Sequence, residues 1–339
     1  MNTDLSNDSY LATNVTNTLA VKTKISLFLT ICSATAVVVT IFSLIVLSGR
    51  RSIRMGSMRV NLITLTIVEI ILNLCILLLS VLQLTGQNAH YILEFIPVCV
   101  LNTALCSRNW IITLIAVARC IAITRPLSSG LHSIDIFRPR FMALITTCCI
   151  LVSLLLSISR FFELDIISTA SSTNESELRI SERTWIIGQI FFTYQIPIPV
   201  SVITVTMIIM IRELFCTQDN AVDLDFKRQS SEKQSNTYNP THRNWHSKQA
   251  TRMIVLLTTI FVLFETPVYF CVMFKAYFEE NTYRMVTHAL KAFVVIDSCA
   301  NVTIYILMSK RFRQETVRIW TRITHIHRRY ATRISETGL

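Results

Sequence analysis

The stretch Trp110–Leu127, WIITLIAVARCIAITRPL, decides the fold class of this chain. Its first nine residues carry no charge, and Arg119 is its first charged side chain. The apolar run extends back to about residue 97, with Arg108 as its one further charged residue. A helix needs about 20 predominantly apolar residues to cross the hydrocarbon core of a bilayer. The stretch 97–124 therefore predicts a membrane-spanning helix.

Six other stretches of the chain are similarly long and apolar. They are 25–48, 60–84, 141–162, 186–214, 252–275 and 286–308. Apolar residues make up 52% of the chain and charged residues only 16%, against about 25% charged in an ordinary soluble domain. Lipid offers no hydrogen-bond partner to backbone groups, so a chain with this pattern crosses the membrane as helices. The sequence predicts an all-α membrane protein with one seven-helix domain over residues 25–308.

The charges of the loops predict the orientation of the bundle. Basic residues gather after the first, third and seventh spans: Arg50, Arg51, Arg54, Arg59, Arg125, Arg138, Arg140, Lys310, Arg311 and Arg313. Because cytoplasmic loops are enriched in Lys and Arg, these regions are expected inside the cell. The tail 1–24 is then extracellular and the tail 324–339 cytoplasmic, in a multi-pass protein of the plasma membrane. The net charge of +11 is attributed to this topology rather than to nucleic-acid binding.

Sequons agree with this orientation. Asn7, Asn14 and Asn174 begin N-x-S/T sequons in segments predicted to be extracellular, so we expect these asparagines to carry glycan. Another sequon begins at Asn301 but lies inside the seventh span and is expected to be unmodified. The polar stretch 217–246 is expected to form a flexible cytoplasmic loop.

Four charged residues lie deep inside the predicted spans. At 1.5 Å per helical residue, Arg108 lies about 16 Å from Arg119, which is at the inner end of the third span. Glu69, Glu265 and Asp297 lie at comparable depths. A charge facing lipid there costs about 2.5–3.5 kcal/mol, so we expect all four to face inward and share partners. The alternative is that they line separate crevices. Three carboxylates outnumber one guanidinium, so one carboxylate is expected to hold a proton.

Four motifs carry a resemblance to a known family. LIAVARCIAITRPL resembles the end of the third helix of rhodopsin-like (class A) G-protein-coupled receptors. LTIVEIILNL resembles their second helix, FETP their sixth-helix proline motif, and NVTIY their seventh-helix Asn-Pro-x-x-Tyr motif. The resemblance implies that Arg119 and Tyr305 take part in G-protein coupling and that Pro267 kinks the sixth helix. It also implies a short amphipathic eighth helix over 309–323, with four residues available to face the membrane: Phe312, Val317, Ile319 and Trp320.

The resemblance also gives the buried polar residues a common location. Six residues, which we call the midplane polar cluster, fall on or beside positions that line the sodium pocket of these receptors: Glu69, Arg108, Glu265, Asp297, Ser298 and Asn301. Arg108 stands where such receptors usually carry serine. Its guanidinium has five donors and no accessible neutral form, so we expect it to replace the sodium ion.

Two fragments, ISRFFEL and FETP, are similar to strings in invertebrate FMRFamide-type neuropeptide receptors. This likeness implies a cell-surface receptor that binds an extracellular peptide, such as a cationic one ending in Arg-Phe-amide, and signals to a heterotrimeric G protein. Candidate ligand-binding residues lie towards the outer side: Glu94, Glu163, Asp165, Trp185, Glu279 and Glu280. The acids among them would form charge-assisted hydrogen bonds to a basic peptide, although solvated loop acids are the commoner explanation for each one.

The chain also departs from the family pattern. Ala118 and Cys120 flank Arg119 where Asp and Tyr are usual, and Val302 stands at the seventh-helix proline position. A seven-helix protein with weak or no G-protein coupling, such as a decoy or a trafficking partner, is therefore the alternative. A transporter is less well supported, because the sequence shows no duplicated pattern. No catalytic or phosphate-binding motif occurs, and we expect neither an enzyme nor a cofactor or metal site.

Overall fold

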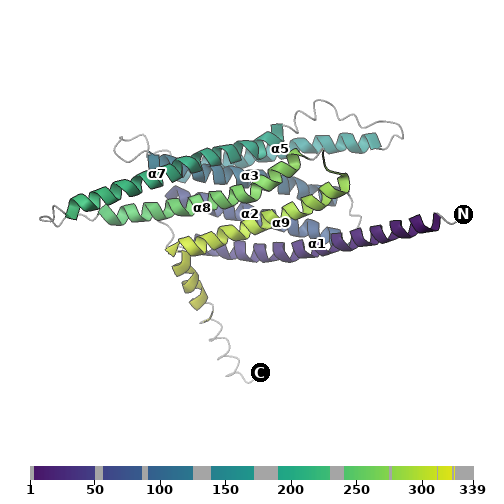
Figure 1. Ribbon diagram of the computed structural model, residues 1–339, viewed down its shortest axis with the longest axis horizontal. Coiled ribbons are helices and arrows are strands. Elements are labelled where there is room, and N and C mark those ends of the chain that lie inside the picture. Colours follow the sequence, from purple (N-terminus) through teal and green to yellow (C-terminus); the bar gives the residue numbers. More distant parts are fainter. Residues whose placement is uncertain are drawn as a thin grey trace, which may run out of the picture.

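The computed structural model describes residues 4–49, 56–85, 91–124, 139–171, 190–229, 240–274, 277–310, 312–322 and 324. Within these ranges the backbone forms seven long helices and no strand. The helices are α1 (Asp4–Ser48), α2 (Gly56–Leu84), α3 (Tyr91–Thr124), α5 (Pro139–Ser171), α7 (Pro197–Gln229), α8 (Pro240–Met273) and α9 (Glu280–Met308). They lie side by side along the long axis of the molecule (Figure 1). The all-α prediction is confirmed.

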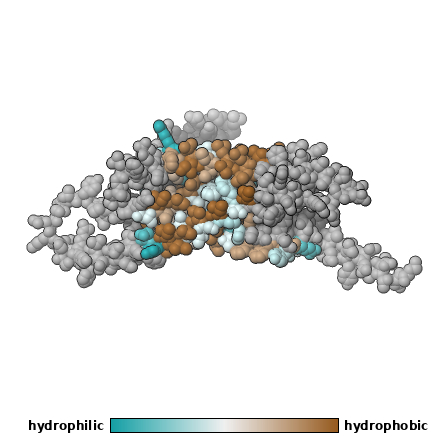
Figure 2. Space-filling model, turned by 90° about the horizontal axis from the view of Figure 1, so that it is seen from above, coloured by the Kyte–Doolittle hydropathy of each residue, from teal (hydrophilic) through white to brown (hydrophobic). Residues whose placement is uncertain are grey.

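The described residues contain seven helical stretches that are long and apolar enough to cross a membrane. These stretches are Thr23–Ser48, Arg59–Leu84, Ile96–Thr124, Pro139–Ile158, Ile190–Glu213, Thr251–Cys271 and Met285–Met308. Their ends agree with the predicted spans to within a few residues. Figure 2 shows hydrophobic residues dominating the central part of one face, with hydrophilic residues at its margins. The chain is therefore a multi-pass membrane protein. Following the orientation expected from the loop charges, we call the end at which α1, α3 and α9 begin the outer end.

The helix α3 holds the central position. It packs against α2, α5, α7 and α8, whereas α1 packs against α2 and α9. Ile111, Ile112 and Ala116 of α3 are fully buried, and so are Leu65 of α2 and Phe261 of α8. Because this interior is filled by interlocking side chains, a polar residue on the same part of α3 can reach several helices at once.

Two helices continue past their spans on the inner side. The structure has α7 running to Gln229 and α8 beginning at Pro240. The expectation of a flexible loop over 217–246 is therefore wrong for the parts of that stretch that the structure describes. No glycine or proline occurs between Val200 and Asn239, so no helix-breaking residue ends α7 at the membrane boundary.

Contacts at the inner end join α1, α2 and the C-terminal helical segment 312–322. Arg59 of α2 donates hydrogen bonds from Nε to the Leu47 carbonyl at 3.1 Å and from Nη2 to the Ser48 carbonyl at 2.9 Å. These carbonyls belong to the last turn of α1, where a cation also stabilises the helix dipole. A Cβ atom at Gly49 would lie 3.1 Å from Oε1 of Glu315, so glycine allows this close approach of the C-terminal segment.

The C-terminal segment 312–322 is the predicted eighth helix, and its apolar residues divide between two environments. Val317 and Trp320 are 63% and 65% exposed, in keeping with the expected membrane-facing side. Phe312 differs from the prediction because it is 5% exposed and its ring lies 6.0 Å from that of Tyr305. Ile319 also packs against the core. The segment is therefore docked on the bundle through one face.

Candidate functional site

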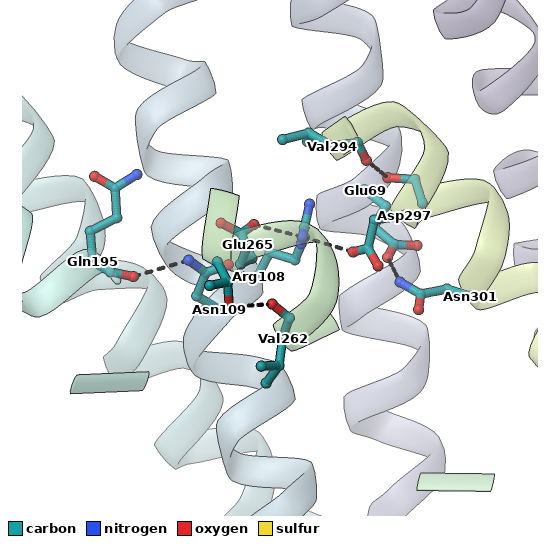
Figure 3. Close-up of polar contacts among 11 residues, drawn as sticks. Glu69, Arg108, Asn109, Gln195, Val262, Glu265, Val294, Asp297 and Asn301 are labelled. Atoms are coloured by element: carbon teal, nitrogen blue, oxygen red, sulfur yellow. Dashed lines mark hydrogen bonds and ion pairs between the residues drawn. The ribbon is translucent and has the colours of Figure 1, made fainter. Parts of the chain in front are cut away.

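The candidate site is built around Arg108 in the interior of the bundle. Its Nη2 atom donates hydrogen bonds to Oε1 of Glu265 and to Oδ2 of Asp297, both at 2.8 Å. The side chain of Arg108 is 0% exposed, and those of Glu265 and Asp297 are 3% and 0% exposed. Figure 3 shows these side chains converging from three helices. One nitrogen atom therefore links α3, α8 and α9 through two ion pairs.

The remaining donors of Arg108 are not used by the described residues. Its Nε and Nη1 atoms are buried and have no hydrogen-bond partner there. The centre of the Phe261 ring lies 5.5 Å from Cζ of Arg108, within cation–π range. Oδ1 of Asp297 likewise accepts no hydrogen bond from a described residue. The cluster is therefore held by ion pairs, but some of its hydrogen-bond donors and acceptors have no partner among the described residues. Its hydrogen bonds can be rearranged without first breaking a complete network.

Glu69 forms the second part of the midplane polar cluster. Its Oε1 accepts a hydrogen bond from Nδ2 of Asn301, which joins α2 to α9. Nδ2 of Asn73 donates to the Glu69 carbonyl at 2.8 Å. Asp297 and Asn301 are four residues apart on α9 and so share one helix face. The structure therefore places Glu69 beside the Arg108 ion pairs, with an amide as its hydrogen-bond partner rather than the guanidinium.

Ser298 is buried with these residues but makes a local contact. Its hydroxyl donates to the carbonyl of Val294 at 3.3 Å, one turn earlier on α9. Among the described residues it makes no hydrogen bond to the charged members of the cluster. Five of the six predicted cluster residues thus take part in contacts between helices, and Ser298 lies among them as a buried neighbour.

Two neighbours of Arg108 on α3 belong to the site but were not predicted. Nδ2 of Asn109 donates to the carbonyl of Gln195 at 3.0 Å, as Figure 3 shows. Nε1 of Trp110 donates to the carbonyl of Tyr194 at 3.2 Å, and the two rings lie 4.8 Å apart. These contacts fasten α3 to the helical turn at residues 190–195, just before α7.

A proline explains why the Gln195 carbonyl is available. In a helix this carbonyl would accept a hydrogen bond from the N–H of the residue four positions later, which is Pro199. Proline has no N–H, so Asn109 supplies the missing donor. The sequence held two signals for this contact. One is an asparagine inside a span, and the other is a proline four residues after Gln195 in a different helix. The sequence could not show that the two helices meet.

The two residues predicted for G-protein coupling lie towards the inner end. Arg119 is half-buried and five residues from the end of α3. Tyr305 is 2% exposed and packs on Phe312, and its hydroxyl has no hydrogen-bond partner among the described residues. The Tyr305 hydroxyl therefore makes no hydrogen bond to Arg119. Nearby, Nε2 of Gln249 donates to the Met308 carbonyl at 2.7 Å and joins α8 to the end of α9.

The other predicted residues are placed less completely. Glu279 is exposed at the N-terminal end of α9 and makes no capping hydrogen bond with its side chain. Pro267 lies inside α8, which continues through it as helix. Several other predicted residues lie in helices, but the structure describes only their backbone: Glu94, Glu163, Asp165, Glu280, Asn7 and Asn14. Trp185 and Asn174 lie outside the described residues. Their roles stay predictions.

Two comparisons with known proteins bear on this arrangement. A family model described as "Serpentine type 7TM GPCR chemoreceptor Srw" matches residues 27–322. The match includes the whole midplane polar cluster and all seven membrane-spanning stretches, apart from residues 23–26 of the first one. No curated protein matches the chain.

Proposed function

The chain belongs to the Srw family of serpentine seven-transmembrane chemoreceptors of the G-protein-coupled type, and on this premise we propose that it binds an extracellular peptide at the plasma membrane and signals to a heterotrimeric G protein. Members of this family are receptors, not enzymes. The narrower likeness of the motifs to rhodopsin-like, FMRFamide-type receptors goes beyond the family match and is part of the proposal. The proposal also includes an extracellular N-terminus that carries glycans.

The observation that carries the proposal is the double ion pair made by one nitrogen of Arg108. Its partners, Glu265 and Asp297, come from two different helices at 2.8 Å each. Losing one partner of a buried charge is strongly unfavourable while the charge stays buried, so this contact favours one packing of the three helices. A ligand that binds a second packing more tightly shifts the population towards it. The cluster thus supplies a two-state element on which a receptor mechanism can act.

The contact to α8 is the one that we propose to change on activation. Glu265 lies two residues before Pro267, whose missing N–H leaves α8 one backbone hydrogen bond short at this level. A helix weakened at this point can bend with little further cost. Release of Glu265 would let the inner part of α8 move away from α3 and open the inner end near Arg119 to a partner protein. Asp297 would keep Arg108 paired during this movement.

We propose that the ligand is a peptide with a basic side chain, and that this side chain binds the candidate acidic residues towards the outer end. Among these acids Glu279 is the one whose side chain the structure describes, and it is exposed. It immediately precedes α9, the helix that carries Asp297. A charge-assisted hydrogen bond at Glu279 would therefore act directly on α9, whose Asp297 pairs with Arg108. Ligand binding at the outer end would thus be connected to the midplane polar cluster through one helix.

The residues that flank Arg119 favour a second candidate function, a seven-helix protein with weak or no G-protein coupling. Ala118 and Cys120 give Arg119 no adjacent carboxylate. A protein of this kind would bind its ligand as a decoy or act as a trafficking partner. Both candidates share the receptor fold and differ in whether the inner end engages a G protein.

The test uses Glu265→Gln, which removes the charge that joins α8 to Arg108 and keeps the size of the side chain. Membranes from cells that express the protein would be assayed for nucleotide exchange on a panel of G proteins without added ligand, normalised to surface expression. We expect exchange above the wild-type level. Glu315→Gln is the control, because its 3.2 Å pair with Arg318 is partly exposed and lies outside the cluster. Well-expressed wild type and Glu265→Gln proteins that are both silent on every G protein would contradict coupling and support the second candidate.

A further inference from the structure

Lys291 is a charged residue in the membrane-spanning part of α9 and does not belong to the midplane polar cluster. It lies inside the stretch Met285–Met308 and is half-buried. Within the residues that the structure describes, its ammonium makes no hydrogen bond and no ion pair. Ionisable groups inside spans are rare and mark functional positions more often than structural ones. Lys291 therefore needs an explanation beyond packing.

The helical periodicity of α9 places Lys291 on its inward face. Ser298 is 0% exposed and lies seven residues later, which is two helical turns, so both residues occupy the same side of α9. Val294 and Val295, between them, are 7% and 1% exposed. On the opposite side Ile296 is 42% exposed, as expected for a residue in contact with lipid. Lys291 thus points to the interior of the bundle rather than to the acyl chains.

Lys291 lies between the cluster and the outer end. It precedes Asp297 by six residues, a rise of about 9 Å along the helix towards the outer end. An ammonium at this height is above the level of the Arg108 ion pairs, and a lysine side chain on a helix leans towards the helix N-terminus, which is the outer end of α9. It is therefore directed away from Asp297.

The described carboxylates leave Lys291 without a counter-charge. Glu265 and Asp297 pair with Arg108, and Glu69 accepts its hydrogen bond from Asn301. Towards the outer end, the described acid on this helix is Glu279, twelve residues earlier and about 18 Å away along the axis. Lys291 is half-buried and its ammonium is not sealed from solvent, so it is available to an anionic group that enters from the outer end of the bundle.

We propose that Lys291 binds a carboxylate of the ligand in the outer half of the bundle. This inference rests on the proposed receptor function and adds an anionic group to the basic one already assigned to the ligand. An ammonium is a compact charge with three rotatable donors and suits a carboxylate that approaches along the axis of the bundle. In a peptide, the carboxylate is either an Asp or Glu side chain or a free C-terminus. Binding there neutralises Lys291 on α9, the same helix that holds Asp297.

The first experiment measures thermal unfolding of the purified full-length protein in lipid nanodiscs without ligand. Lys291→Met removes the charge and keeps the apolar stem, and we expect an unfolding midpoint equal to or above that of the wild type. Lys310→Met is the matched control, because Lys310 is exposed at the inner end of α9. A clear fall in the midpoint for Lys291→Met alone would show that the ammonium has a structural partner, and this would overturn the proposal.

The second experiment measures stabilisation of the same samples by matched probes. The probes are phenylacetate and phenylacetamide, together with the dipeptide Gly-Phe and its C-terminal amide. We expect saturable stabilisation by the two carboxylates and at least about tenfold weaker binding of their amides. Lys291→Met should remove the preference and Lys291→Arg should retain it. A peptide with an Asp side chain and an amidated end distinguishes a side-chain carboxylate from a C-terminal one.

The outcomes separate this proposal from the proposed function. Equal stabilisation by acids and amides, or a preference that survives Lys291→Met, overturns the carboxylate site and leaves a lysine that only reaches the outer membrane interface. Both experiments use binding and unfolding alone, so a protein that never activates a G protein can still pass them. A failure of signalling is thereby distinguished from a failure of the site.

Discussion

Arg108 on α3 and Glu265 on α8 are 157 residues apart in the chain, yet Nη2 of the arginine lies 2.8 Å from Oε1 of the glutamate. The same nitrogen binds Asp297 of α9 at 2.8 Å. Because a guanidinium stays charged at all physiological pH values, the interior contains a permanent cation held by two acids.

Arg108→Ser should strongly destabilise the protein. The substitution leaves Glu265 and Asp297 buried without their cation, and breaking a buried pair in this way costs about 3–5 kcal/mol. Unfolding of the purified protein in nanodiscs would measure the loss of stability. Arg318→Ser is the matched control, because the pair with Glu315 is partly exposed and such pairs contribute less than about 1 kcal/mol. Equal losses for the two variants would contradict the role given to Arg108.

Sodium should have little specific effect on the wild-type protein. Arg108 already supplies a cation to the carboxylates, whereas Arg108→Ser reinstates a hydroxyl and frees them. The folded fraction of that variant should therefore be stabilised by sodium. Unfolding midpoints would be compared in sodium and in an organic cation at constant ionic strength. A wild type whose stability depends strongly on sodium itself would rule out the internal cation.

Asn109→Ala should cost about 1 kcal/mol, because it leaves the partly buried Gln195 carbonyl without its donor. The cost should fall by about 1 kcal/mol in the background of Pro199→Ala, which restores a backbone N–H for that carbonyl. The four proteins of this double-mutant cycle would be compared by unfolding. Additive effects of the two substitutions would mean that Pro199 does not create the need for Asn109.

Arg119→Ala should reduce nucleotide exchange while leaving surface expression near normal. Arg119 is half-buried near the inner end of α3, where a long cation can reach carbonyls of a partner protein once α8 moves. The measurement is exchange in the activated Glu265→Gln background, normalised to surface expression. Unchanged exchange in the double variant would assign Arg119 to folding alone.

Glycosylation should follow the orientation set by the basic loops. In a eukaryotic host, at least one of Asn7, Asn14 and Asn174 should carry glycan, while Asn301 should not because it is buried at 0% exposure inside α9. Mass spectrometry of glycopeptides would identify the sites. Glycan on Asn301 would overturn the assigned topology.

The spans could be read from the sequence because a membrane-crossing helix is recognised by the length and composition of one continuous stretch. The same local argument placed Arg108 on an inward face, since a guanidinium in contact with lipid at that depth is costly. Neither conclusion requires knowledge of the neighbouring helices. The docking of Phe312 did require such knowledge: the family resemblance implied the eighth helix, and the contact with Tyr305 showed that Phe312 faces the core.

The partners inside the bundle were decided by tertiary structure. The sequence grouped Glu69, Glu265 and Asp297 around Arg108, and the structure paired the last two with the arginine and Glu69 with Asn301. One residue of helix turns a side chain by about 100°, so small rotations of α2, α8 and α9 choose among these pairings. The contact of Asn109 with Gln195 depends in the same way on the register of α3 against the turn before α7. Rotation and register are set by the packing of all seven helices together, which no single stretch of sequence contains.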